Sequence, residues 1–151
     1  MAELDAVGGV DGVQRHYKIF GERFGYAALP PPDRVQAAAG ILTEAERFDD
    51  LMKLAATYRR EYPQVAEQMV NAAGYAQLKG NRLAEGLAIL TRNAEMFPVS
   101  PNVYDSLGDA RCLNGDQKGA LDARQNAVRA AERASHPRLP AYQARLTKPC
   151  T

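Results

Sequence analysis

The feature that most constrains the fold of this chain is a sequence repeat with a period of 34 to 35 residues. When the sequence is shifted by 34 residues, Ala73-Gly74 falls on Leu107-Gly108. When it is shifted by 35 residues, Glu61-Tyr62-Pro63 falls on Met96-Phe97-Pro98. A period of this length is typical of solenoids, in which each unit covers the apolar face of its neighbour. We therefore expect three copies, which span residues 33–63, 64–98 and 101–135.

Each copy is predicted to form two antiparallel helices. In the middle copy we expect helices over residues 64–79 and 83–96, because apolar residues recur every three or four positions. Gly80 and Asn81 separate them, since both residues tolerate the left-handed conformation that ends a helix. The apolar positions expected to face the core are Val65, Met69, Ala72, Ala73 and Ala76, followed by Leu83, Leu87, Leu90 and Ala94.

The third copy carries the clearest helix signals, and the first is more degenerate. Ser100 is predicted to cap a helix whose first turn contains Pro101, and a turn at 114–116 leads to a second helix that ends near residue 134. In the first copy, helices are expected over residues 33–45 and 48–62. The positions predicted to line the helices of the third copy are Tyr104, Leu107, Gly108, Ala110, Arg111, Cys112, Ala120, Leu121, Ala127 and Val128.

The repeat resembles the tetratricopeptide repeat over about residues 33–134. The resemblance implies an all-α fold, in which three helix pairs form a right-handed superhelix. Glycine at Gly74 and Gly108 is expected to let two helix backbones approach closely. The sequence departs from the family pattern at Gly86, where a small alanine is usual, and at Arg111 and Arg124, where aromatic residues are usual. The signature positions are Gly74, Pro98, Tyr104, Leu107, Gly108, Gly115, Ala120 and Ala127.

A narrower resemblance concerns residues 93–110, which read NAEMFPVSPNVYDSLGDA, and residues 12–26. The first stretch is similar to tetratricopeptide tails attached to bacterial serine hydrolases of the α/β-hydrolase esterase type. The second is similar to the helix that often follows the esterase domain. This resemblance implies an alternative function, namely a C-terminal accessory domain of an esterase-like hydrolase that modulates its oligomeric state or substrate access.

The two ends of the chain are predicted to flank the repeats. Residues 1–12 are glycine-rich and acidic and are expected to be a flexible linker. A leading helix is expected over residues 13–28, before a proline-rich joint. Residues 136–151 are expected to form a cap or tail, with a short helix over 141–146 that covers the apolar end face of the last repeat.

Composition and charge exclude several classes of function. The 19 basic and 18 acidic residues nearly balance, which argues against a nucleic-acid-binding protein. No stretch approaches the ~20 apolar residues of a transmembrane helix. The N-terminus has neither the basic start nor the apolar core of a signal peptide, so we expect a cytoplasmic protein. The 26 alanines favour helix over sheet.

No catalytic, metal or cofactor site is predicted. None of the three serines lies in a G-x-S-x-G turn, and Ser106 falls inside a predicted helix with no base partner. His16 is expected to be a packing or surface residue, and His136 is expected to be a solvated loop residue. Two cysteines are too few for a disulfide framework or a zinc site, so Cys112 is predicted to be a small buried thiol and Cys150 to be exposed. We therefore expect a protein that is not an enzyme.

The tetratricopeptide resemblance implies a binding groove lined by the first helix of each pair. This wall is polar and mildly acidic, so a basic or neutral segment should fit it better than an acidic one. The alternative is that these residues are solvated or pack against the chain's own N-terminal helix. The predicted groove residues in the second and third copies are Gln68, Asn71, Tyr75, Lys79, Asn102, Asp105 and Asp109.

The C-terminal third is basic, with seven Lys or Arg residues against two acidic ones between residues 117 and 148. It could dock on an acidic face of a parent enzyme or of a second copy. Alternatively it is a solvated face, with Arg124, Arg129 and Arg133 spread along an outer helix. The function expected from all these features is a non-catalytic protein–protein interaction or self-association module. Its partner would be a protein or peptide, its own hydrolase domain, or a second copy in a homodimer.

Overall fold

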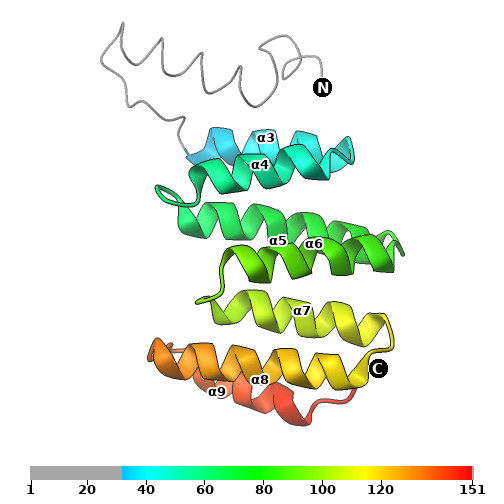
Figure 1. The fold of residues 1–151 in the computed structure, drawn as a ribbon, viewed down its shortest axis with the longest axis vertical. Coiled ribbons are helices and arrows are strands. Elements are labelled where there is room, and N and C mark those ends of the chain that lie inside the picture. The colour runs from blue at the N-terminus through cyan, green and yellow to red at the C-terminus, as the bar shows by residue number, and fades with distance from the viewer. Residues whose placement is uncertain (1–31, 151) are drawn as a thin grey trace, which may run out of the picture. The chain divides into compact units, whose positions relative to one another are not determined.

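The computed structural model describes residues 32–150, which form seven α-helices and one short 3-10 helix (Figure 1). The predicted linker over 1–12 and leading helix over 13–28 lie outside the described residues. None of the helices in the described part of the chain is long and apolar enough to cross a bilayer. The helices are α3 (Pro32–Glu44), α4 (Phe48–Tyr58), α5 (Pro63–Lys79), α6 (Leu83–Met96), α7 (Pro101–Leu113), α8 (Gln117–Arg133) and α9 (Leu139–Ala144), followed by η1 (Arg145–Thr147).

The chain divides into two compact units between Met69 and Val70. In the first unit, α3 and α4 are antiparallel neighbours that pack together. Helix α4 ends at Tyr58 rather than at residue 62 as predicted. The next helix begins at Pro63, and a residue before proline is disfavoured in helical conformation, so the chain needs a turn at this point. The buried residues of α3 and α4 are Val35, Ala39, Leu42, Leu51, Met52, Leu54, Ala55 and Tyr58.

In the second unit, α6, α7 and α8 are antiparallel neighbours, and the most extensive packing is between α7 and α8. Helix α9 lies against α8 (Figure 1). Its Tyr142 is 2% exposed and packs on Ala127, Val128 and Ala131 of α8. This aromatic contact fixes the C-terminal end of the chain to the last long helix.

One backbone turn recurs at the ends of successive helices. Glu46, Asn81 and Gly115 all have positive φ angles, of 56°, 59° and 79°. In each case the N–H of the next residue donates a hydrogen bond of 2.8 to 2.9 Å to a carbonyl five residues back, which is the Schellman arrangement. The sequence repeat is therefore also a repeat of backbone geometry.

The buried stripes differ from the predicted apolar positions. Ala72, Ala76 and Leu121 were expected to face the core, but all three are exposed. The reason is that the true stripes include polar residues, Gln77 on α5, Asn93 on α6 and Arg124 on α8, which a purely apolar pattern passes over. The buried residues of α5 are Ala66, Met69, Val70, Ala73, Gly74, Gln77 and Leu78.

Glycines make room where the helices of the second unit meet. A Cβ on Gly74 would lie 2.5 Å from Cγ of Leu90. A Cβ on Gly86 would lie 2.6 Å from Cδ2 of Leu78 and 3.1 Å from the carbonyl oxygen of Gly74. Both distances to side chains are shorter than a carbon–carbon contact allows. The side chain of Leu90 therefore fills the space at Gly74, where a close approach of two backbones is predicted from the sequence. That close backbone approach occurs instead at Gly86.

The helix caps also differ from expectation in one place. Helix α7 begins at Pro101, but the Ser100 side chain makes no capping hydrogen bond. Proline has no N–H, so this helix start has one donor fewer to satisfy. At the start of α8, the carboxylate of Asp116 accepts a hydrogen bond of 2.8 Å from the N–H of Gly119.

Candidate functional site

The structure brings three of the seven predicted groove residues together. The hydroxyl of Tyr75 on α5 donates a hydrogen bond of 2.9 Å to Oδ2 of Asp109 on α7. Asp105 lies one helical turn before Asp109 on the same face of α7. We call the surface formed by Tyr75, Asp105 and Asp109 the acidic surface.

The other four predicted groove residues lie elsewhere. Gln68 is an exposed residue of the first unit, and Lys79 is exposed in the last turn of α5. Asn71 is half-buried, and its Oδ1 is buried without a hydrogen-bond partner. Asn102 is half-buried in the first turn of α7.

The guanidinium group of Arg145, from η1, occupies the acidic surface. Its Nε lies 2.5 Å from Oδ1 of Asp105, as an ion pair rather than a well-directed hydrogen bond. Its Nη2 donates a hydrogen bond to Oδ1 of Asp109. One arginine from the C-terminal segment therefore bridges both carboxylates of α7.

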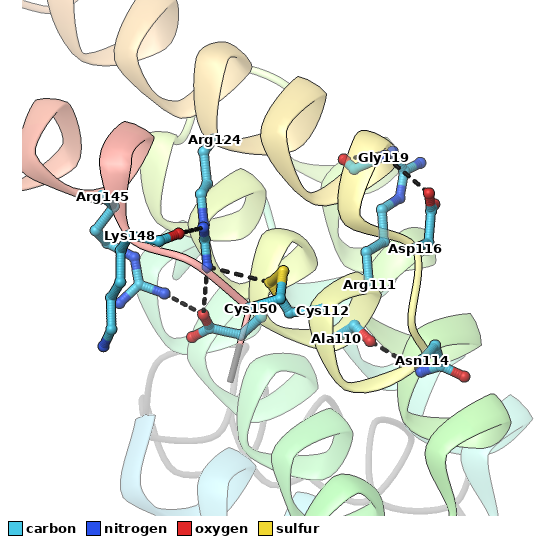
Figure 2. The surroundings of a disulfide bond; sticks show 11 residues. Ala110, Arg111, Cys112, Asn114, Asp116, Gly119, Arg124, Arg145, Lys148 and Cys150 are labelled. Carbon is cyan, nitrogen blue, oxygen red and sulfur yellow. Dashed lines mark hydrogen bonds and ion pairs between the residues drawn. A yellow bond between two sulfur atoms is a disulfide. The ribbon is translucent and has the colours of Figure 1, made fainter.

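A second arginine, Arg124 of α8, points its guanidinium group toward the same site, beside Lys148 and Cys112 (Figure 2). The residue is only 5% exposed. Its Nη1 donates a hydrogen bond of 2.6 Å to the carbonyl of Lys148, and its Nη2 donates one of 3.2 Å to Sγ of Cys112. The same Nη2 lies 4.0 Å from Oδ1 of Asp109. A buried charge needs such partners, because burial removes it from water.

The burial of Arg124 corrects the prediction that it lies on a solvated outer face. The reason is the glycine at position 108, since a Cβ there would lie 3.1 Å from Cγ of Arg124. The absence of a side chain at Gly108 lets the long arginine run between α7 and α8. Arg129 and Arg133, on the same helix, are exposed.

A disulfide bond joins Cys112, near the end of α7, to Cys150 (Figure 2). The bond corrects the predictions of a buried thiol at Cys112 and an exposed cysteine at Cys150. A count of cysteines could not reveal it, because the pairing depends on α8 and α9 returning the chain to the end of α7. The two cysteines are separated by 38 residues in the sequence.

A shallow hollow of about 220 Å³ lies between the acidic surface and the disulfide. Residues of α5, α7, α8 and the C-terminal segment line it. Its lining residues are Tyr75, Asp109, Cys112, Leu113, Arg124, Lys148, Pro149 and Cys150.

The electrostatics of the acidic surface favour a bound cation. Burial raises the pKa of Asp105 above its usual value, and Asp109 acts in the same direction, although Arg145 opposes both. Burial also raises the pKa of Tyr75 to about 12. Because two partly desolvated carboxylates lie side by side, they are more stable as ions when a guanidinium group bridges them.

Other predicted site residues lie apart from this surface. The His136 ring is 5.7 Å from the ring of Tyr142, and its Nδ1 accepts a hydrogen bond of 3.2 Å from the N–H of Arg138, so it is not the freely solvated residue that was predicted. Ser106 is buried within α7, and His16 lies outside the described residues. Within residues 32–150, no group of three or more His, Cys, Asp or Glu side chains could hold a metal ion.

Sequence reasoning missed the roles of Arg124, Arg145 and the two cysteines. The signal that could have found Arg145 was present, because the C-terminal third is basic and the predicted wall is acidic. The sequence suggests an acidic face for that basic third on a parent enzyme or a second copy. The structure places one on the chain itself.

No protein-family model matches the chain, and neither a curated protein nor a solved structure matches it. Function must therefore be inferred from the contacts of the acidic surface.

Proposed function

We propose that the chain is a non-catalytic protein-interaction module of the tetratricopeptide type, and that its acidic surface binds an arginine-containing segment of a partner. The observation that carries this proposal is the position of Arg145, whose guanidinium group pairs with both Asp105 and Asp109. The chain's own arginine indicates which chemistry this surface accepts.

The arrangement of the helices supports this proposal. Tyr75 and Asp109 belong to the first helices of successive repeats and are 34 residues apart. Recurrent turns hold consecutive helices as antiparallel neighbours. Successive first helices can then contribute to one continuous surface, which is how helical repeats recognise extended segments.

The two carboxylates favour arginine over lysine. Asp105 and Asp109 are four residues apart on one helix, so their side chains are neighbours. A planar guanidinium group with several N–H donors can bridge both carboxylates, whereas an ammonium group acts as a point charge. When Arg145 is absent, Arg124 and Arg138 are cations that still lower the pKa of Asp105. Acidic segments are disfavoured by like charge.

The affinity of this surface is expected to be modest. The side chains of Arg145 and Asp109 are 26% and 31% exposed, and partly exposed ion pairs contribute little free energy each. A flexible segment also loses conformational entropy when it binds. Several contacts along the segment are needed before binding becomes tight.

The test uses a full-chain double variant, Arg145→Gln with Cys150→Ser, which removes the arginine that bridges Asp105 and Asp109. Circular dichroism first establishes that this variant keeps its helical content. Fluorescent peptides of equal length, one arginine-rich and one glutamate-rich, are then titrated against it by anisotropy. We expect the arginine-rich peptide to bind and the glutamate-rich peptide not to bind, with an affinity that falls as salt increases.

Variants of this protein in which aspartate is replaced by asparagine identify the surface that binds the arginine-rich peptide. Adding Asp105→Asn and Asp109→Asn should abolish binding of the arginine-rich peptide. Adding Asp122→Asn, an exposed acidic residue on α8, should leave binding within about twofold. The proposal is refuted if the variant with Asp105→Asn and Asp109→Asn binds the arginine-rich peptide as well as the variant with Asp122→Asn does. It is also refuted if the double variant itself does not bind this peptide.

A further inference from the structure

We infer that residues 145–150 are a tethered occupant of the acidic surface, and that the Cys112–Cys150 disulfide controls whether a partner segment can replace them. This inference rests on the proposed function, because it assigns a regulation to the same surface. In the covered state, the disulfide is intact and residues 145–150 occupy the acidic surface. In the accessible state, the disulfide is reduced and a partner segment can bind there.

The segment is held at three points along its length. Arg145 pairs with Asp105 and Asp109, at its start. The carbonyl of Lys148 accepts a hydrogen bond from Arg124, in the middle. Cys150 forms the disulfide, at its end. Both the ionic and the covalent contacts therefore keep the segment in place as part of the lining of the hollow beside the acidic surface.

Side-chain packing contributes little to holding the last part of this segment. Thr147, Lys148 and Pro149 are all exposed. Upstream, the buried Tyr142 anchors α9 to α8. Leu146 also packs against the Tyr142 cluster, so the part that lacks apolar contacts begins at Thr147. That part opens at low free-energy cost once its covalent link is removed. The disulfide is thus the contact on which the covered state depends.

The tether makes the segment a strong competitor while the disulfide is intact. A segment joined to its own binding surface at both ends acts at a high effective concentration, which a free partner segment must overcome. The apparent affinity for a partner falls in proportion to the fraction of molecules in which the surface is open. If the segment is in place in most molecules, the partner binds correspondingly more weakly.

Opening requires a dithiol reductant. A dithiol transfers two electrons and two protons to the Cys112–Cys150 disulfide, which becomes two thiols, while the dithiol becomes a disulfide. A reducing compartment would favour the accessible state. An oxidant that accepts the two electrons would restore the covered state.

The test uses the full chain in its oxidised and its dithiothreitol-reduced states, with thiol counts to verify each state. The probe is a fluorescent synthetic peptide of residues 143–150 with Cys150→Ser, titrated by anisotropy. We expect the reduced chain to bind this peptide about tenfold or more tightly than the oxidised chain. The full-chain variant Cys150→Ser should bind like the reduced chain and should not respond to dithiothreitol.

Hydrogen–deuterium exchange provides a readout that needs no peptide. We expect amides of residues 145–150 to exchange faster after reduction, while those of α7 and α8 remain protected. Unchanged exchange in this segment would overturn the inference.

The outcomes of the peptide titration separate this inference from the function on which it rests. If the oxidised and reduced chains bind the peptide equally well, the regulation is wrong but the proposed function stands. If neither the reduced chain nor the Arg145→Gln, Cys150→Ser variant binds any arginine-containing peptide, both are wrong.

Discussion

Tyr75 and Asp109, which lie 34 residues apart, are joined by a hydrogen bond of 2.9 Å from the phenol to the carboxylate. They occupy equivalent positions in successive copies of the sequence repeat, so one period of the repeat becomes one direct contact. Asp109 also pairs with Arg145 and lies near Arg124. A single carboxylate therefore connects α5, α7, α8 and the C-terminal segment.

The half-buried phenol of Tyr75 predicts a loss of stability at alkaline pH. Its pKa is raised from 10.0 to about 12 by burial, so between these values the folded chain retains a proton that the unfolded chain has lost. The free energy of unfolding must then fall as pH rises through this range. Urea denaturation at several pH values should show this fall in the wild type and a smaller one in Tyr75→Phe. Equal slopes would contradict the assignment.

Two glycine-to-alanine substitutions should change stability in opposite directions. A Cβ on Gly74 would lie 2.5 Å from Cγ of the fully buried Leu90, so Gly74→Ala should cost about 1–2 kcal/mol through overpacking. Gly40 is exposed within α3, and a Cβ added there would meet no atom within 4 Å, so Gly40→Ala should stabilise by about 0.5–1 kcal/mol. Denaturant unfolding measures both, and a stabilising Gly74→Ala would contradict the packing described for α5 and α6.

Two leucines with the same predicted role should behave differently. Leu90 is fully buried, and Leu90→Ala should destabilise by about 2–5 kcal/mol because it leaves a cavity. Leu121 is 41% exposed, and Leu121→Ala should change stability by less than about 1 kcal/mol. Thermal or urea unfolding of the two variants tests the observed buried stripes against the predicted ones. Similar losses of stability in both variants would indicate that Leu121 faces the core, as predicted from the sequence.

Two candidate helix caps allow a similar comparison. Asp116 accepts a hydrogen bond from the N–H of Gly119, so Asp116→Ala should cost about 1 kcal/mol. Ser100 makes no side-chain capping hydrogen bond, so Ser100→Ala should be close to neutral. The midpoints of urea unfolding decide between these expectations. A larger loss for Ser100→Ala would show that α7, rather than α8, depends on its cap.

Local signals in the sequence were sufficient to predict most of the helices. Apolar spacing and the Gly80-Asn81 turn predicted helices over 64–79 and 83–96, and the structure has them at Pro63–Lys79 and Leu83–Met96. The end of α4 was predicted too late, because apolar and charged residues of 59–62 continue the helical pattern up to the proline. Such boundaries depend on where the chain must turn, which local composition does not determine.

The acidic surface was only half predictable. Helical spacing predicts the positions of Tyr75, Asp105 and Asp109, because it places each of them on the side of a first helix that is expected to face the groove. Arg124 and Arg145 do not, because their positions depend on the space at Gly108 and on the return of the C-terminal segment. The disulfide needs the same tertiary path, and its cysteines show no spacing that a local pattern could detect.

The central claim is that the carboxylate of Asp109 recognises arginine, and a double-mutant cycle tests it most directly. The Arg145→Gln, Cys150→Ser full chain, with and without Asp109→Asn, is titrated with the peptide of residues 143–150 carrying either arginine or glutamine at position 145. We predict a coupling energy of about 1 kcal/mol between Asp109 and the peptide arginine. Effects that add to within about 0.3 kcal/mol would contradict the account, because they would show that the two groups do not interact.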